Sequence, residues 1–83
     1  MQHLARTAQQ IGAIVRRERR ARGLTQRQLA DKVGLRQATV SKLEKGEPAT
    51  QLRTLLDVLA ALNLELIVGD RGKASKDDIE RLF

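Results

Sequence analysis

A chain of 83 residues can form one domain with a small hydrophobic core, to which oligomerisation would add stability. The absence of cysteine excludes disulfides and thiolate metal sites, and the absence of a long apolar segment leads us to expect a cytoplasmic protein without a membrane partner. The net charge of +6 is uneven, because residues 1–56 carry 12 Lys and Arg against four Asp and Glu, which favours a polyanionic partner. Since Phe83 is the single aromatic residue, there is no platform for stacking unpaired bases, and duplex DNA is the favoured nucleic acid.

The first helix is predicted over residues 7–22, and Gly23 follows as its C-cap. Its apolar residues at helical spacing are Ile11, Ile14, Val15 and Ala21. Basic residues occupy much of the remaining surface, namely Arg16, Arg17, Arg20 and Arg22. Two interpretations of these arginines stay open: an ordinary solvated surface, or phosphate contact by at least one of them.

Two short helices joined by a tight turn are predicted next. Thr25 and Gln28 have the spacing of a capping box, so Thr25 opens the second helix. Gly34 ends that helix in a left-handed conformation that a Cβ would penalise. The third helix is predicted over residues 36–45, with Gly46 as its stop and with Val40 and Leu43 directed inward.

A leucine-rich fourth helix is predicted over residues 51–62, with Thr50 as its N-cap and Asn63 as its C-cap. Its apolar face comprises Leu52, Leu55, Leu56, Leu59 and Leu62. This face is expected in the core, with an extension to a dimer interface kept open.

A single β-strand is predicted over residues 64–68, where the hydrophobic period changes from helical to alternating. No second strand pattern exists in the chain, so the same strand of a second copy is its expected partner. The dimer interface is assigned to Leu64, Leu66, Ile67 and Val68. The chain thus divides into a DNA-binding domain at 1–62, a dimerisation strand at 63–70, and a flexible or short helical tail at 71–83.

The third helix has small or polar residues on its outward side, as close approach to a major groove requires. Gln37 has the amide that pairs with adenine, and Arg36 or Lys42 has the reach for guanine. The predicted base-reading residues are Arg36, Gln37, Ala38, Thr39, Ser41 and Lys42. Phosphate contacts are assigned to Arg17, Thr25, Gln26, Arg27 and Lys45, because free N–H groups at the start of the second helix suit an anion and because the other side chains are basic.

The segment from 24 to 46 resembles the Xre/Cro-type helix-turn-helix family, of the phage-repressor kind. The matching residues are Leu24-Thr25-Gln26, Leu29-Ala30, Gly34, Val40-Ser41, Leu43-Glu44 and Gly46. The resemblance covers about residues 11–62 and implies a recognition helix at 36–45, Gln26 on the DNA backbone, and a buried pair between Arg19 and Glu44. Arg36 departs from the family pattern, where many members have a small polar N-cap, which weakens that cap.

The whole chain is similar to the narrower group of HipB-like antitoxins. The shared features are Gln37-Ala38-Thr39-Val40-Ser41, the leucine-rich fourth helix, and the strand Leu64-Glu65-Leu66-Ile67-Val68. The similarity implies a mainly α, phage-repressor-like bundle of four to five helices with one C-terminal strand paired across a homodimer. It also implies an autorepressing antitoxin that binds a palindromic operator and a HipA-like kinase toxin.

Enzymatic chemistry is not expected, because the chain has no nucleophile–base set, metal-ligand spacing or phosphate-binding loop. Accordingly we expect no cofactor and no metal. Two alternatives to the antitoxin stay open: a free-standing phage-type regulator without a toxin partner, and a protein-interaction adaptor that has lost DNA binding. The basic N-terminal part argues against the adaptor.

Overall fold

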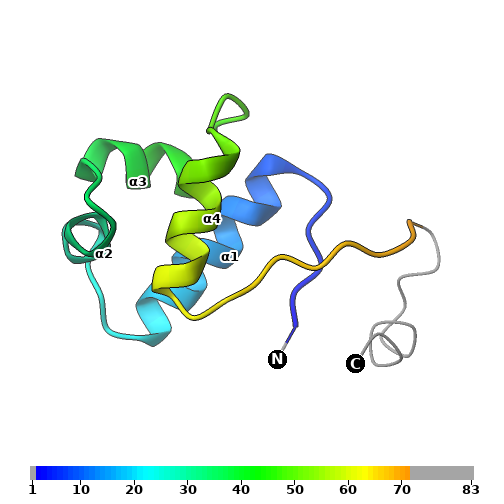
Figure 1. The fold of residues 1–83 in the computed structure, drawn as a ribbon, viewed down its shortest axis with the longest axis horizontal. Coiled ribbons are helices and arrows are strands. Elements are labelled where there is room, and N and C mark those ends of the chain that lie inside the picture. The colour runs from blue at the N-terminus through cyan, green and yellow to red at the C-terminus, as the bar shows by residue number, and fades with distance from the viewer. Residues whose placement is uncertain (1, 72–83) are drawn as a thin grey trace.

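The computed structural model describes residues 2–71. This part of the chain contains four helices, α1 (Ala8–Ala21), α2 (Gln26–Val33), α3 (Gln37–Glu44) and α4 (Leu52–Ala61). In Figure 1 the helices surround a common centre, with α2 and α3 at one end and the extended segment after α4 at the other. The mainly helical fold class is confirmed. The short helix expected as one alternative for the tail at 71–83 lies outside the described residues.

The first two helices begin at threonine caps, Thr7 and Thr25, of which the sequence predicts Thr25. The Thr7 hydroxyl accepts a hydrogen bond from the Gln10 N–H at 3.1 Å. At α2 the Thr25 hydroxyl accepts from the Gln28 N–H at 3.0 Å, and the Gln28 side chain accepts from the Thr25 N–H at 2.9 Å. This reciprocal pair is the predicted capping box, and it satisfies N–H groups that have no partner inside the helix.

The next two helices begin without a side-chain cap. Arg36 occupies the N-cap of α3 and makes no capping hydrogen bond, which confirms the expected weak cap. The prediction for α4 is wrong, since its N-cap is Gln51 and no side chain caps it. Thr50 belongs to the preceding turn, where its N–H donates to the Glu47 carbonyl at 3.2 Å. The turn therefore continues one residue further than the sequence pattern indicates.

The helix α2 ends at the predicted Gly34, whereas α4 ends one residue earlier than predicted. Gly34 has a φ of 69°, and the following Leu35 N–H donates to the Ala30 carbonyl at 2.9 Å, which lets the chain turn sharply into α3. After α4 the C-cap is Leu62, and Asn63 is the next residue, with a φ of 58°. Asparagine is one of the few residues other than glycine that adopts this left-handed conformation readily.

The core lies where the four helices meet. Its buried hydrophobic residues are Val15, Leu29, Ala30, Val40, Leu43, Val58, Leu59 and Leu62. Most of these were predicted to face inward, but the sequence analysis missed Val58, which is fully buried. The inward assignment of Ala21 is wrong, because Ala21 is exposed. Six residues at 3.6 per turn place Ala21 about 120° around the helix from Val15, away from the core.

The segment after α4 runs outward without regular secondary structure in the single chain. Leu64 packs against the core, but Leu66, Ile67 and Val68 are exposed at 52%, 44% and 87%. A strand needs a neighbour for its N–H and C=O groups, so strand pairing of 64–68 with a second copy stays a prediction. Over residues 2–71 no helix has the length and apolarity to cross a membrane.

Candidate nucleic-acid interface

The interface is built on α3, whose buried side fixes the direction of its outward side. Val40, Leu43 and Glu44 are buried against the other helices. The opposite side of α3 therefore faces solvent, and most of the predicted base-reading residues lie on it. Arg36, Gln37, Ala38 and Lys42 are exposed, whereas Thr39 and Ser41 are half-buried. The structure thus leaves four of the six side chains fully available to a DNA partner.

The predicted phosphate-contacting residues fall into two groups. Arg17, Thr25, Arg27 and Lys45 are exposed. Gln26 is half-buried, and its amide Nε2 donates to Glu44 Oε1 at 3.1 Å. One N–H of the Gln26 amide therefore bonds to a buried carboxylate, and the second amide N–H and the backbone N–H stay available for an anion.

Arg19 and Glu44 meet across the packed helices α1 and α3. Arg19 Nε donates to Glu44 Oε2 at 2.7 Å and Nη2 donates to Oε1 at 3.0 Å, with the two side chains only 9% and 2% exposed. Arg19 Nη1 also donates to the Leu24 carbonyl at 2.8 Å. The hydrogen bonds to Glu44 raise the pKa of the Arg19 guanidinium above its usual value, so the guanidinium stays charged.

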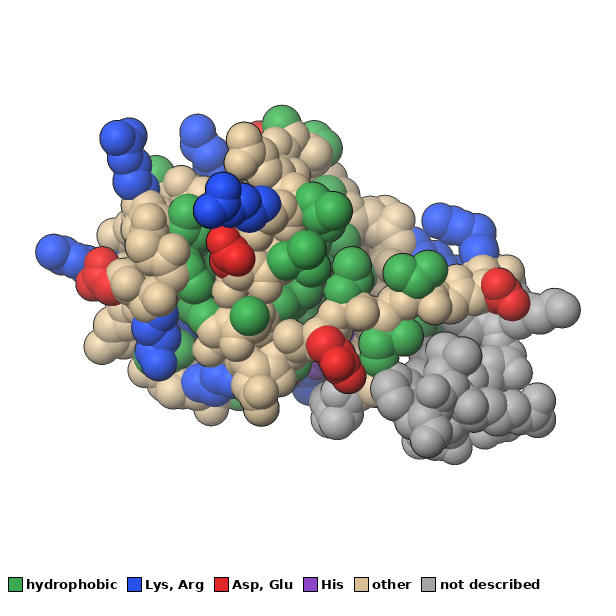
Figure 2. Space-filling view, viewed as in Figure 1, with side chains coloured by type: hydrophobic (Ala, Val, Ile, Leu, Met, Phe, Trp, Pro, Cys, Tyr) green, Lys and Arg blue, Asp and Glu red, His purple; other side chains and the backbone are tan. Residues whose placement is uncertain are grey.

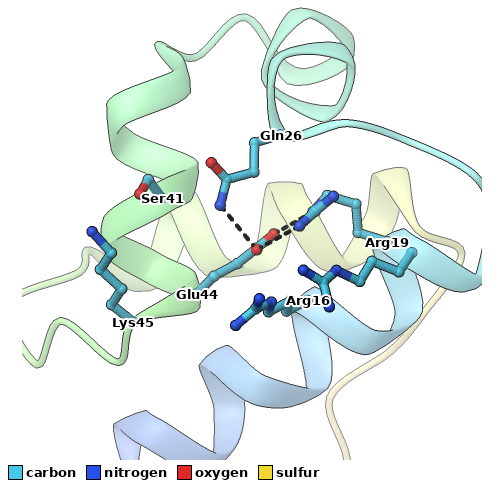
Figure 3. A pocket seen from close by; sticks show the side chains of 7 residues that line it. Arg16, Arg19, Gln26, Ser41, Glu44 and Lys45 are labelled. Atoms are coloured by element: carbon cyan, nitrogen blue, oxygen red, sulfur yellow. Dashed lines mark hydrogen bonds and ion pairs between the residues drawn. The ribbon is translucent and has the colours of Figure 1, made fainter.

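This network locks the relative positions of three helices. Arg19 comes from α1, Gln26 from the start of α2 and Glu44 from the end of α3 (Figure 3). A two-fold hydrogen bond between a guanidinium and a carboxylate constrains both distance and orientation. The outward side of α3 is consequently held rigidly relative to the α2 N-terminus, as a surface that reads DNA requires.

An open pocket of about 290 Å³ lies beside the network, between α1, α2 and α3. It is lined by Arg16, Arg19, Arg20, Gln26, Ser41, Glu44 and Lys45 (Figure 3). Arg17, which the sequence predicts as the phosphate contact of the first helix, is not among these residues. The helical period contained a usable signal, because Arg16 and Arg20 lie about 60° and about 100° around the helix from Arg19, whereas Arg17 lies about 160° away. The family resemblance already implied that Arg19 is directed inward.

Basic and hydrophobic side chains are unevenly distributed over the face of the molecule drawn in Figure 2. Figure 2 shows Lys and Arg side chains projecting around the end that holds α2 and α3, whereas hydrophobic side chains gather over α4 and along the extended segment. The large exposed hydrophobic residues of that second area are Leu52, Leu56, Leu66, Ile67 and Val68. Within the described residues no group of three or more His, Cys, Asp or Glu side chains is arranged to hold a metal ion.

Comparison with known proteins agrees with this geometry. The helix-turn-helix family matches residues 15–68. Antitoxin HipB of Escherichia coli K12 is 33% identical over 72 residues, which cover 87% of this chain and 82% of HipB. An uncharacterised HTH-type transcriptional regulator of Sinorhizobium fredii is 32% identical over 68 residues, which cover 82% of this chain and 35% of that protein.

Solved structures of HipB superpose on most of the chain. A HipB variant in complex with an O2 20mer has a TM-score of 0.79 at 30% identity, covering 86% of this chain and 99% of the other. A HipA–HipB–O2–O3 complex has a TM-score of 0.76 at 31% identity, with the same coverage. From the matched residues and from these superpositions, the chain belongs to the helix-turn-helix family and, within it, to the HipB-like antitoxins.

Proposed function

We propose that this chain is a sequence-specific repressor that binds double-stranded DNA, and that it is the autorepressing antitoxin of a HipBA-type toxin–antitoxin operon. The observation that carries the proposal is the rigidly held, small and polar outward side of α3, which the Arg19–Glu44–Gln26 network orients. Related HipB chains have been solved with O2 and O4 20mers, which supports operator DNA as the partner.

In the proposed complex, α3 enters a major groove and presents its base-reading residues to the base edges. Gln37 pairs with adenine, while Arg36 or Lys42 contacts guanine. Thr25, Gln26, Arg27 and Lys45 hold the flanking phosphates and set the orientation of α3. A dimer would place two such helices about one helical turn apart, or a multiple of it, on a palindromic operator.

The dimer forms through the hydrophobic area that the single chain leaves exposed. Leu64, Leu66, Ile67 and Val68 pair as a strand with the same segment of a second copy, and this pairing satisfies backbone groups along 64–68. Leu52 and Leu56 of α4, exposed at 63% and 42%, extend the apolar area next to the core. Large apolar side chains gathered in one region are typical of a protein interface.

The second proposed partner is a HipA-like kinase toxin, docked on a surface away from α3 so that DNA and toxin bind together. The HipA–HipB–O2–O3 complex of a relative supports this partner. The proposed protein works in the cytoplasm by binding alone, without enzymatic chemistry. A free-standing regulator is the second candidate, supported by the match to the Sinorhizobium regulator, whose own length is covered only to 35%.

The first experiment is selection of genomic fragments by the purified full chain at physiological salt. We expect a palindromic site upstream of the chain's own gene, and capture of a kinase-like neighbouring gene product on the same DNA. Selected sites elsewhere, with no such neighbour, would favour the free-standing regulator. Absence of any enrichment over random fragments would refute sequence-specific binding and leave the adaptor as the better account.

A further inference from the structure

We propose that the pocket between α1, α2 and α3 seats one phosphate of the bound DNA, and that Arg16 and Arg20 of α1, with Lys45 of α3, are its cationic ligands. This inference rests on the proposed function and deepens it, because it replaces Arg17 as the phosphate-binding arginine of the first helix. It also selects Arg16 and Arg20 from the four arginines of the first helix for which the sequence leaves phosphate contact open.

The charge of the pocket is the first argument. Its single carboxylate, Glu44, has a side chain that is only 2% exposed, and both of its oxygens accept hydrogen bonds from Arg19 and Gln26. Arg16, Arg20 and Lys45 have no carboxylate within ion-pair distance among residues 2–71. The pocket therefore carries a cationic excess whose counter-charge must come from outside the described part of the protein.

The packing of α1 on α3 is the second argument. Gly12 is buried, and a Cβ built on it would lie 2.5 Å from the Leu43 carbonyl oxygen, so only a glycine permits this close approach. Arg16 and Arg20 follow Gly12 at intervals of four residues and thus continue along the same side of α1. The close contact at Gly12 consequently brings both arginines to the C-terminal half of α3, where Lys45 lies.

The position of the pocket relative to the base-reading surface is the third argument. Gln37, Ser41 and Lys45 are spaced by four residues and lie along one side of α3, and Ser41 and Lys45 line the pocket. Figure 3 shows Ser41 and Lys45 on the α3 side of this pocket and Arg16 and Arg19 on the α1 side, with Glu44 between them. Lys45 is about 12 Å along the helix axis from Gln37 at 1.5 Å per residue. An α3 helix seated in a groove would therefore present the pocket to the backbone beside that groove.

The remaining arginines of α1 do not share this arrangement. Arg22 Nη1 donates to Glu18 Oε1 at 3.0 Å and to the Glu18 carbonyl at 2.8 Å, so its charge is already partnered. Arg17 is exposed and does not line the pocket. Arg17 precedes Glu18 and follows Arg16 directly, so it makes a matched control for Arg16 with the same residue type, the same helix and the same loss of charge.

The size of the pocket suits the ligand. About 290 Å³ corresponds to roughly ten waters at about 30 Å³ each, so the open pocket has room for a phosphodiester group in place of water. The Arg19–Glu44 pair remains intact during this binding, because the three free cations supply the charge. The site is thus prepared before DNA arrives, and its affinity is not reduced by reorganisation of the fold.

The test compares Arg16→Gln, Arg20→Gln and Arg17→Gln on the strongest site selected by the wild-type chain. We expect Arg16→Gln and Arg20→Gln each to weaken binding about tenfold, as loss of a charged hydrogen bond predicts. The slope of log affinity against log salt should fall by about one per half-site for either variant. Arg17→Gln should stay within about twofold of wild type, which is the size expected for a diffuse surface charge.

Ethylation interference then identifies the phosphate. In wild type, ethylation of one phosphate per half-site should block binding. Ethylation of that same phosphate should no longer reduce the binding of Arg16→Gln or Arg20→Gln, whereas it should still block the binding of Arg17→Gln. All three side chains are exposed, so we expect unchanged thermal unfolding. Equal losses for the three variants would overturn the pocket assignment while leaving the repressor intact. A wild-type chain that selects no site would refute the proposed function, and the pocket assignment would fall with it.

Discussion

Replacing Glu44 by glutamine should remove much of the stabilising free energy of the Arg19–Glu44 ion pair, while the size and shape of the side chain stay nearly the same. The change leaves Arg19 charged, with a side chain only 9% exposed, and removes an acceptor from its two-fold hydrogen bond. It also places an amide N–H opposite a guanidinium N–H. Loss of one partner from a buried pair costs about 3–5 kcal/mol. We expect about 3 kcal/mol, at the low end, because Arg19 borders an open pocket that water can enter.

The measurement is the free energy of unfolding in urea, followed by circular dichroism at one fixed protein concentration, because dimerisation links stability to concentration. The midpoint should fall while the slope stays constant, since the surface exposed on unfolding does not change. Asp57→Asn on exposed α4 surface is the matched control and should stay within about 0.5 kcal/mol of wild type.

A double variant, Arg19→Met with Glu44→Met, separates the net free energy that the ion pair contributes from the cost of an unpaired buried charge. Replacing both partners of a buried pair by apolar groups is often neutral, so the double variant should be more stable than Glu44→Gln. A loss below about 1 kcal/mol in Glu44→Gln would show that the pair behaves as an exposed one and would refute the reasoning.

The remaining predictions concern DNA, assembly, packing and pH. Gln37→Ala should cost about 1–3 kcal/mol on the selected site and relax preference at one base pair, with random DNA bound as before in competition assays; an equal loss on random DNA would contradict base reading. Leu66→Pro should shift the mass from light scattering toward monomer, because proline removes a ladder hydrogen bond, and an unchanged dimer would place the interface elsewhere. Gly12→Ala should destabilise the protein by about 1–3 kcal/mol in thermal unfolding, because the added Cβ would lie 2.5 Å from the backbone of α3. This steric cost outweighs the gain in helix propensity of about 1 kcal/mol. A rise in stability would mean that α1 can move away from α3 at little cost. Hydrogen bonding from Arg22 lowers the pKa of Glu18 below 4.5. The ionised Glu18 carboxylate therefore stabilises the fold above pH 4.5, and this stabilisation is lost as the pH falls through the lowered pKa. Unfolding curves of Glu18→Gln measured between about pH 6 and about pH 3 should show a weaker pH dependence than wild type, and an identical dependence would contradict this role.

Several features of the fold could be predicted because they depend on residues three or four positions apart. The Thr25–Gln28 capping box and the left-handed Gly34 belong to this class. The apolar period placed most of the core, and it contained the signal for Val58 as well, since Val58 lies three residues after Leu55. Thr50 shows the limit of local patterns, because the turn after α3 continues through it and α4 begins one residue later, after the Gln51 N-cap.

The sequence by itself determined the helix-turn-helix unit, its outward residues and the excess of basic charge, because helical period, capping and net charge are properties of neighbouring residues. Only the tertiary structure decided which arginines share a pocket, since Arg16, Arg20 and Lys45 come from helices α1 and α3 and meet where Gly12 allows close packing. It also decided that Gln26 bonds to Glu44 in the interior. Contacts between distant segments depend on how helices pack, and helix packing depends on every buried side chain together rather than on any local pattern.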